Sequence, residues 1–253
     1  MKRQRRTIQA DTEIRSRDLG GIAGYAIGVL YMATPFVFVP GNIQNATTLP
    51  FPVAYECVEG VTLPQLLSGA ETVGDALIAA ATRLERRGVR AIVGACGSFA
   101  RFQTLLTNAV RIPVFSSILT QVPWLIRSLP ADQRVLVLFA DRRSFTPAMR
   151  SECGITDLRR IVISDCMAIP EFCAMLARPY TLQHAALERA LVRHVKREMV
   201  EHKNIGLIVL QCSELPPYAA AIQDAVSSAV VDVVTLATWA HEVVTRRPYI
   251  RRI

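Results

Sequence analysis

The sequence lacks the short signatures that mark several common classes of enzyme. It contains no G-x-x-x-x-G-K phosphate-binding loop and no G-x-S-x-G turn that would expose a nucleophilic serine. The glycine-rich stretch GGIAGYAIG departs from the G-x-G-x-x-G pattern, and no acidic residue follows it at the spacing of a dinucleotide site. We therefore expect no nucleotide cofactor.

Short paired cysteine spacings are also missing. The six cysteines include no C-x-x-C pair, and no histidine lies beside them at the spacing of a zinc ligand. We therefore expect neither a metal site nor a disulfide framework. For four of them we expect reduced, partly buried thiols, as in a cytoplasmic protein: Cys57, Cys153, Cys166 and Cys173.

The sequence does not favour a membrane-spanning segment either. Residues 22–39 carry no charge and approach the length of a span. However, Pro35 interrupts this run, and Asp11, Glu13 and Asp18 dilute the basic flank before it. No small-residue cleavage site of a signal peptide follows. We expect a first buried strand here and no contact with a membrane.

Positive charge is in excess, with 29 Lys and Arg against 21 Asp and Glu and a formal net charge of +8. Such an excess favours anionic partners in general. Much of it lies in a basic N-terminal tail (1–20) and in the last residues of the chain. Runs of charge at chain ends are typical of solvated tails. We therefore expect a small anionic, carboxylate-bearing substrate and no nucleic acid.

Strand-like and helix-like segments alternate along the rest of the chain. Residues 73–87 place their apolar side chains on one helical face and end at Gly88, whereas 90–95 reads as a buried strand. The same alternation continues to the C-terminus, with a long charged helix at 187–203. We expect the histidines on or near that helix to face solvent: His184, His194 and His202. The alternation predicts an α/β fold with parallel sheets covered on both faces.

Two stretches share one arrangement: AIVGACGSFARFQ (91–103) and GLIVLQCSELPPY (206–218). Each runs from a buried strand through a cysteine into a helix, and a short β-branched strand follows (114–118 and 230–235). Since the cysteines are separated by close to half the chain, we predict two lobes related by a pseudo-twofold axis. Lobe 1 should contain 21–119 plus 231–253, and lobe 2 should contain 120–230.

Each cysteine, Cys96 and Cys212, should lie at the carboxyl end of a parallel strand, where ligands bind in such sheets. A lone cysteine there is more often a packing residue. Ser98 and Ser213 could cap the helices that follow, and Pro216 or Pro217 fits a first helical turn. A helix N-terminus lowers the pKa of a thiol below its usual value of about 8.5 and attracts a substrate carboxylate.

Two opposed thiols suit the inversion of a carbon next to a carboxylate. One thiolate removes the Cα proton from one face, and the other cysteine, as a thiol, delivers a proton to the opposite face. The reaction runs in both directions when the protonation states exchange. Two lobes that face each other would provide this geometry.

Here the sequence resembles a known family. ACGSFARFQ and QCSELPPYAAAIQ, together with the earlier PGNIQN and the later VVDVVTLATW, are similar to the cofactor-independent aspartate/glutamate racemase superfamily. This superfamily includes hydantoin racemase, maleate isomerase and arylmalonate decarboxylase. The resemblance runs from about residue 24 to 245. It implies two flavodoxin-like lobes with the active site in the cleft between them, no cofactor and no metal. It also implies that Cys96 and Cys212 are the acid/base pair.

Departures from the family pattern leave the substrate open. Gly97-Ser98 replaces the usual Asn-Thr, Ser213-Glu214 follows where Thr is common, and Asn42 stands where Asp is expected. By position, we expect substrate contacts at Asn42, Asn45, Gly97, Ser98, Ser117, Ser213 and Glu214. The leading hypothesis is a racemase or epimerase, and we expect it to form a homodimer. The alternatives are a decarboxylase, a cis–trans isomerase or a ligand-binding relative without turnover.

Overall fold

The computed structural model describes residues 24–246, so the predicted basic tail (1–20) lies outside the described residues. Its strands form two four-stranded sheets, and every pairing is parallel. The first sheet has the order β2-β1-β3-β4 and the second β6-β5-β7-β8. The strands are β1 (Ile27–Tyr31), β2 (Val53–Cys57), β3 (Ala91–Gly94), β4 (Val114–Phe115), β5 (Arg134–Phe139), β6 (Ile161–Asp165), β7 (Ile205–Leu210) and β8 (Ala229–Val231). The two-lobed α/β architecture predicted from the alternation is confirmed.

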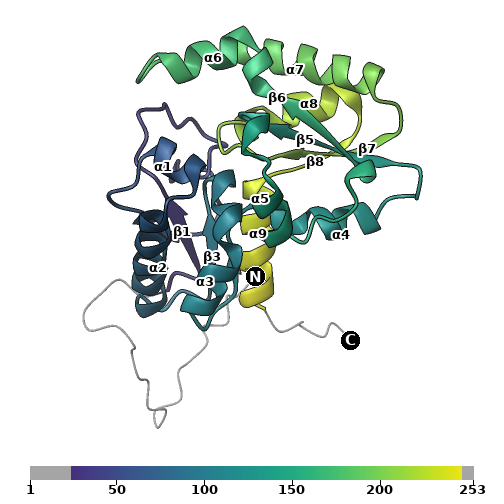
Figure 1. Ribbon diagram of the computed structural model, residues 1–253. Helices are drawn as coiled ribbons and strands as arrows, with labels where there is room; N and C mark the ends of the chain where they lie inside the picture. Colours follow the sequence, from purple (N-terminus) through teal and green to yellow (C-terminus); the bar gives the residue numbers. More distant parts are fainter. Residues whose placement is uncertain (1–23, 247–253) are drawn as a thin grey trace, which may run out of the picture.

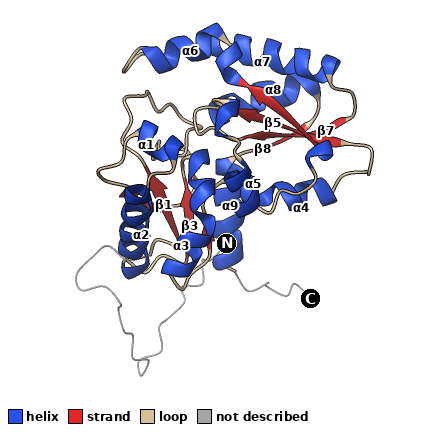
Figure 2. Ribbon diagram, viewed as in Figure 1, coloured by secondary structure: helices blue, strands red, loops and turns tan. Residues whose placement is uncertain are grey.

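Helices cover both sheets, as the all-parallel pairing requires. Figure 1 shows the first lobe with α2 and α3 on its outer side, and the second lobe beneath α6 and α7. Figure 2 shows the strands enclosed by these helices. The α-helices are α1 (Leu63–Ser68), α2 (Glu71–Arg86), α3 (Gln103–Ala109), α4 (Val122–Arg127), α5 (Pro147–Glu152), α6 (Pro170–Ala177), α7 (His184–Glu201), α8 (Ala219–Val226) and α9 (Val233–Val244).

The chain passes between the sheets twice, from β4 to β5 and from β8 into α9. Although α9 follows the last strand of the second sheet, it packs against β1 and β3 of the first. One buried cluster joins the facing sides of both lobes through α9, with members such as Val93, Val137 and Leu236. The outer face of each sheet has a separate cluster under its own helices. The lobes therefore share one central apolar core.

Three local expectations are corrected by the structure. The segment 230–235 was expected as a strand, but β8 ends at Val231 because the Asp232 side chain accepts the N–H groups of Val234 and Thr235 and starts α9. The helix expected over 99–110 is a 3-10 helix, Gly97–Phe102, followed by α3. His194 is buried rather than exposed, because Ser164 and Arg197 hydrogen-bond its two ring nitrogens. Among residues 24–246, no helix is long and apolar enough to cross a membrane.

Candidate active site

The two cysteines follow equivalent strands of the two sheets. Cys96 comes two residues after β3, and Cys212 comes two residues after β7. The residue before each cysteine donates its backbone N–H to the neighbouring central strand, from Ala95 to Leu30 O at 2.8 Å and from Gln211 to Leu138 O at 3.0 Å. Immediately after these matching hydrogen bonds, the backbone leaves each sheet at an equivalent point. Each thiol is thus carried to the carboxyl edge of its sheet.

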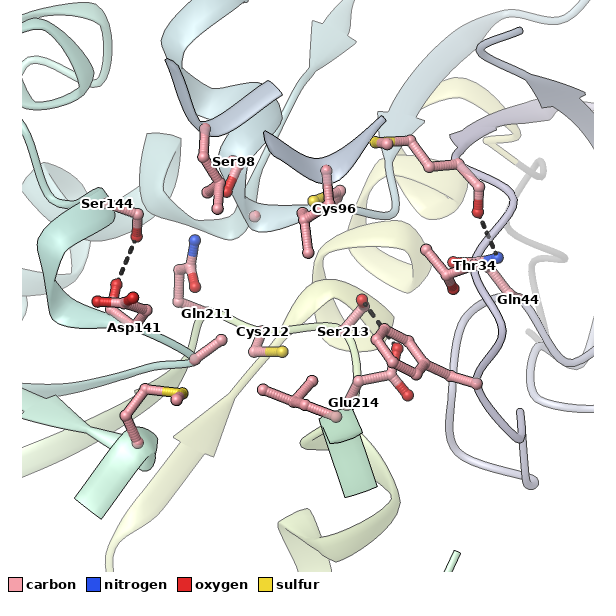
Figure 3. Close-up of a pocket in the computed structure, with 18 residues that line it drawn as sticks. Thr34, Gln44, Cys96, Ser98, Asp141, Ser144, Gln211, Cys212, Ser213 and Glu214 are labelled. Carbon is pink, nitrogen blue, oxygen red and sulfur yellow. Dashed lines mark hydrogen bonds between the residues drawn. The ribbon is translucent and has the colours of Figure 1, made fainter. Parts of the chain in front are cut away.

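Both thiols open into one cavity of about 280 Å³ between the lobes. In the view of Figure 3, Cys96 lies on one side of this cavity and Cys212 on the other. The remaining lining residues are Met32, Thr34, Phe36, Gln44, Leu63, Leu67, Gly97, Ser98, Ala140, Asp141, Ser144, Met167, Leu176, Gln211, Ser213 and Glu214. Among the described residues that line it there is no Arg, Lys or His. The cavity is therefore mainly apolar, with two carboxyl groups and no cationic side chain.

The cysteine loops touch each other at Gly97. A Cβ atom on this residue would lie 2.2 Å from Nε2 and 2.4 Å from the backbone oxygen of Gln211. No side chain fits in such a space, so the Asn common at this position in the family could not be accommodated here. The glycine allows the two loops to approach, and the Gln211 amide reaches the cavity wall beside Gly97.

Burial governs the protonation of the thiols. It raises the pKa of Cys96, although the backbone N–H and hydroxyl of Ser98 and the N–H of Phe99 oppose this. It raises the pKa of Cys212 further, because Glu214 adds a like charge and its N–H is the one opposing hydrogen bond. The expected lowering by helix N-terminal N–H groups therefore exists but is outweighed. Because both pKa values lie above the ordinary thiol value, both cysteines are protonated at neutral pH.

Glu214 is the carboxyl group whose charge acts on both thiols. Burial raises its pKa to about 7, while hydrogen bonds from Asn42 and Ser213 oppose the rise. Asn42 Nδ2 donates to Glu214 Oε2 at 3.1 Å, and the Asn42 oxygen accepts the N–H of Gln44 at 2.8 Å. This contact joins a loop of the first lobe to the second cysteine loop. A Cβ on Gly41 would lie 2.7 Å from Pro217 Cα, which shows how closely the loops pack.

The other residues predicted to contact substrate divide into two groups. Gly97, Ser98, Ser213 and Glu214 line the cavity, and Asn42 lies behind Glu214. Asn45 and Ser117 do not line it. The Asn45 amide donates to Phe38 O and its oxygen accepts from Thr47, whereas the Ser117 hydroxyl oxygen accepts the Leu119 N–H. Both side chains stabilise local turns.

Ser98 and Ser213 do not cap helices, contrary to expectation. The 3-10 helix after the first cysteine begins at Gly97, with Cys96 at its N-cap. A second 3-10 helix, Pro216–Tyr218, has Leu215 at its N-cap, so only the predicted proline in its first turn is confirmed. Freed from capping, both serine side chains line the cavity.

Several lining residues were not predicted. Gln211 is buried beside Cys212, and among the described residues its side-chain amide has no hydrogen-bond partner. Its position directly before the second cysteine was the available signal. Thr34, Gln44 and Asp141 come from loops that follow β1 and β5, and no local pattern marked them. A loop that follows a central strand can be assigned to the site only when the order of the strands in the sheet is known.

Possible metal ligands gather elsewhere. In the described part of the chain, one group brings three potential ligand atoms within 4.8 Å of one another: Glu198, Glu201 and His202 at the end of α7. This group shares no residue with the cavity. The cavity itself offers two thiols, two carboxyl groups and neutral polar groups.

The fold agrees with the comparison to known proteins. Residues 44–241 match the Asp/Glu/Hydantoin racemase family, and the chain belongs to this family. Solved structures with the same fold include allantoin racemase from Klebsiella pneumoniae, at 13% identity with a TM-score of 0.58 and 87% of each chain covered. An aspartate racemase homologue from Pyrococcus horikoshii is 17% identical with a TM-score of 0.54, covering 86% of this chain and 97% of that one. At these identities the likeness establishes the fold alone.

One curated relative is named as a lyase rather than as a racemase. The chain is 30% identical over 220 residues to dimethylsulfoniopropionate lyase 3 from Emiliania huxleyi, covering 83% of this chain and 57% of the relative. The chain thus spans about half the length of the curated relatives it matches.

Proposed function

We propose that this protein is an enzyme that removes the proton from the carbon next to a substrate carboxylate, with Cys96 and Cys212 as its acid/base residues. The observation that carries the proposal is the placement of two thiols on opposite walls of one small interlobe cavity. A racemase-family fold supports an acid/base role for them. The neutral donors at the wall, above all the unpartnered Gln211 amide, are suited to a carboxylate.

The reaction we propose is a β-elimination from a small sulfonium carboxylate of the dimethylsulfoniopropionate type. A cysteine thiolate takes the Cα proton and becomes a thiol. The electron pair of that C–H bond forms the Cα=Cβ double bond as the bond from Cβ to sulfur breaks. Neutral dimethyl sulfide leaves, and acrylate remains. The likeness to a lyase of this name supports the choice.

The lining of the cavity also favours a cationic leaving group. A dicarboxylate such as aspartate would meet Glu214 and Asp141 with no cationic side chain among the described lining residues. A sulfonium group instead carries a positive charge and apolar methyl groups. The carboxylates attract its charge, while Phe36 and Met167 offer apolar or π-electron contacts to its methyl groups.

A cationic substrate would also lower the raised pKa values of the thiols. A positive charge in a partly dry cavity stabilises a nearby thiolate and so lowers the pKa of the thiol. We propose Glu214 as the group that accepts the thiol proton, since it is the carboxyl group whose charge acts on both cysteines. The N–H groups of Ser98 and Phe99 and the Ser98 hydroxyl act to lower the pKa of Cys96, whereas the Glu214 N–H alone does so at Cys212, so we assign Cys96 as the base.

Racemisation is the second candidate. It is favoured by the presence of thiols on both walls, since an elimination needs only one base. The two reactions can be distinguished in D₂O by their products. Elimination from dimethylsulfoniopropionate releases dimethyl sulfide and acrylate, whereas racemisation of an amino acid or hydantoin introduces deuterium at Cα without loss of any group.

The experiment is to incubate the purified protein with dimethylsulfoniopropionate, amino acids, hydantoins and arylmalonates in D₂O. Dimethyl sulfide is measured in the headspace, CO₂ release is recorded and Cα exchange is followed by NMR. We expect dimethyl sulfide and acrylate in equal amounts, and loss of both in the Cys96→Ser variant. Exchange of the Cα proton, or release of CO₂, with another substrate would replace the elimination by racemisation or decarboxylation as the reaction of this protein. No turnover of any substrate would reject enzymatic function for this panel.

A further inference from the structure

The C-terminal end of α7 carries a charge pattern opposite to the usual one. A helix C-terminus bears partial negative charge, which favours Lys and Arg in the last turn. The last turn of α7 contains neither, and two carboxylates stand there instead, Glu198 and Glu201. His202 follows them as the C-cap residue. This end of the helix therefore concentrates negative charge, although the chain as a whole has a formal net charge of +8.

Glu198 is a buried carboxylate without a permanent counter-ion. It is 8% exposed, and among the described residues its ion-pair contacts are with two histidines, His194 and His202, and not with any Lys or Arg. The Ser164 hydroxyl donates to Glu198 Oε1 at 3.0 Å, whereas no described residue donates a hydrogen bond to Oε2. Buried charges in proteins are normally paired or coordinate a metal ion. The Oε2 atom is therefore available to a cation.

The neighbouring His194 does not supply the missing positive charge. Arg197 Nη2 lies 2.8 Å from His194 Nδ1, and a guanidinium only donates hydrogen bonds, so Nδ1 accepts. The ring proton is therefore on Nε2, which donates to Ser164 Oγ at 2.6 Å. His194 is thus neutral. A chain of donors runs from Arg197 through His194 and Ser164 to Oε1 of Glu198, and it fixes the orientation of this carboxylate.

Two further ligand atoms lie beside the available oxygen. His202 Nε2 is 3.5 Å from Glu198 Oε2. Two ligand atoms of a tetrahedral zinc ion, each about 2.1 Å from the metal, lie about 3.4 Å apart. Glu201 completes a set of three, whose ligand atoms all lie within 4.8 Å of one another. The Glu201 side chain is 55% exposed, and its contact with Arg197 Nε, at 3.7 Å, is longer than a hydrogen bond, so it can turn toward the other two.

We propose that Glu198, Glu201 and His202 bind a divalent transition-metal ion of the zinc type. One imidazole nitrogen with two carboxylates suits zinc, whereas Mg²⁺ and Ca²⁺ take oxygen ligands. The ion would balance the buried charge and the partial charge of the helix end. Since Ser164 belongs to β6 and the group shares no residue with the active-site cavity, the metal would stabilise α7 on the second sheet. The site uses no cysteine, so the cysteine spacings could not reveal it.

Zinc binding to the full chain tests the site. After metals are removed with a chelator, we expect one equivalent of Zn²⁺ to bind with a Kd of about 10 μM or tighter in calorimetry. Because the six cysteines could also bind zinc, Co²⁺ is the second probe. Thiolate ligands give Co²⁺ an intense near-ultraviolet charge-transfer band, which we expect to be absent. Mg²⁺ should not compete. With free Zn²⁺ at about 100 times Kd, the melting temperature should rise by about 5–10 °C.

Ligand variants locate the ion. His202→Gln and Glu201→Gln, whose side chains reach the surface, should each weaken zinc binding by about tenfold or more and reduce the rise in melting temperature, with unchanged circular dichroism. Ser164→Ala should weaken binding by about tenfold, because Ser164 orients Glu198. His184→Gln, at the exposed start of α7, is the matched control and should bind zinc as wild type does. No binding up to about 100 μM Zn²⁺, a thiolate band with Co²⁺, or equal affinity in His202→Gln and wild type overturns the proposal.

Discussion

At the scale of single residues, Gly97 determines how closely the cysteine loops can approach. Gly97→Ala would place a Cβ against the backbone oxygen of Gln211, which no side-chain rotation can relieve. We expect kcat/KM to fall about tenfold or more, and the free energy of unfolding to fall by about 1–3 kcal/mol through overpacking. Gly74→Ala is the control, because its Cβ would meet only the flexible end of Leu105 within a helix. Equal losses in both variants would contradict this role for Gly97.

The two cysteines should differ in their contribution. If the reaction is elimination, Cys96→Ser should lower kcat by about 100-fold or more, because a serine hydroxyl is a far weaker base than a thiol. Cys212→Ser should retain more activity. If the reaction is racemisation, both variants should lose turnover in both directions. A variant that keeps one thiolate could still exchange the Cα proton of one enantiomer. Steady-state kinetics and NMR exchange distinguish these patterns.

The remaining cysteines provide the controls for that experiment. Burial raises the pKa of Cys153 to about 12 and holds that of Cys166 far above its usual range, so neither supplies a thiolate near neutral pH. Cys57→Ser and Cys173→Ser, at partly buried positions outside the cavity, should leave turnover near wild type. Loss of activity in these two variants would place the chemistry elsewhere.

Glu214 should make stability depend on pH. Its folded-state pKa of about 7 lies above the ordinary glutamate value of about 4.3. Its contribution to stability is therefore fully present below about pH 4, and it is lost as pH rises to about 7. The loss is on the order of 3 kcal/mol. Urea unfolding of Glu214→Gln at pH 5 and pH 8 should show a smaller decline than wild type. Glu201→Gln, at an exposed position, should decline as wild type does.

At the scale of elements, the start of α9 depends on Asp232. This buried side chain accepts the N–H groups of Val234 and Thr235, and the Thr235 hydroxyl accepts the Asp232 N–H. Asp232→Ala should lower the free energy of unfolding by about 1–2 kcal/mol. Asp224→Ala, at an exposed position within α8, should have little effect. Equal urea midpoints for wild type and Asp232→Ala would contradict the cap.

The same element shows where sequence patterns reach their limit. In VVDVVT, the β-branched residues favour a strand, yet Asp232 begins a helix because its carboxylate satisfies two N–H groups. By contrast, the apolar face of α2 and the central strands were predictable, since one regular pattern governs each of them. The short helices α1, α4 and α6 were not predicted, because six to eight residues hold too few turns to show a period.

At the scale of the whole molecule, the site exists only through contact between distant segments. The repeated cysteine motifs predicted two equivalent strand ends, and the structure places both at one cavity. The contact of Asn42 with Glu214 joins residues 172 positions apart, and no local pattern encodes such a pair. The raised pKa values likewise follow from burial between lobes, which outweighs the local N–H groups considered in the sequence.

The lobes should unfold as one unit. The central core cluster contains Val93 of the first sheet, Val137 of the second and Leu236 of α9 between them, all buried. Leu236→Ala should lower the free energy of unfolding by about 2–5 kcal/mol, because it removes contacts and leaves a cavity. The melting temperature should fall by roughly 2–4 °C for each kcal/mol. Calorimetry should show one transition before and after the change, since neither lobe keeps a closed core alone. Two resolved transitions in the wild-type protein would contradict a shared core, and a variant that melts as wild type would show that α9 does not join the lobes.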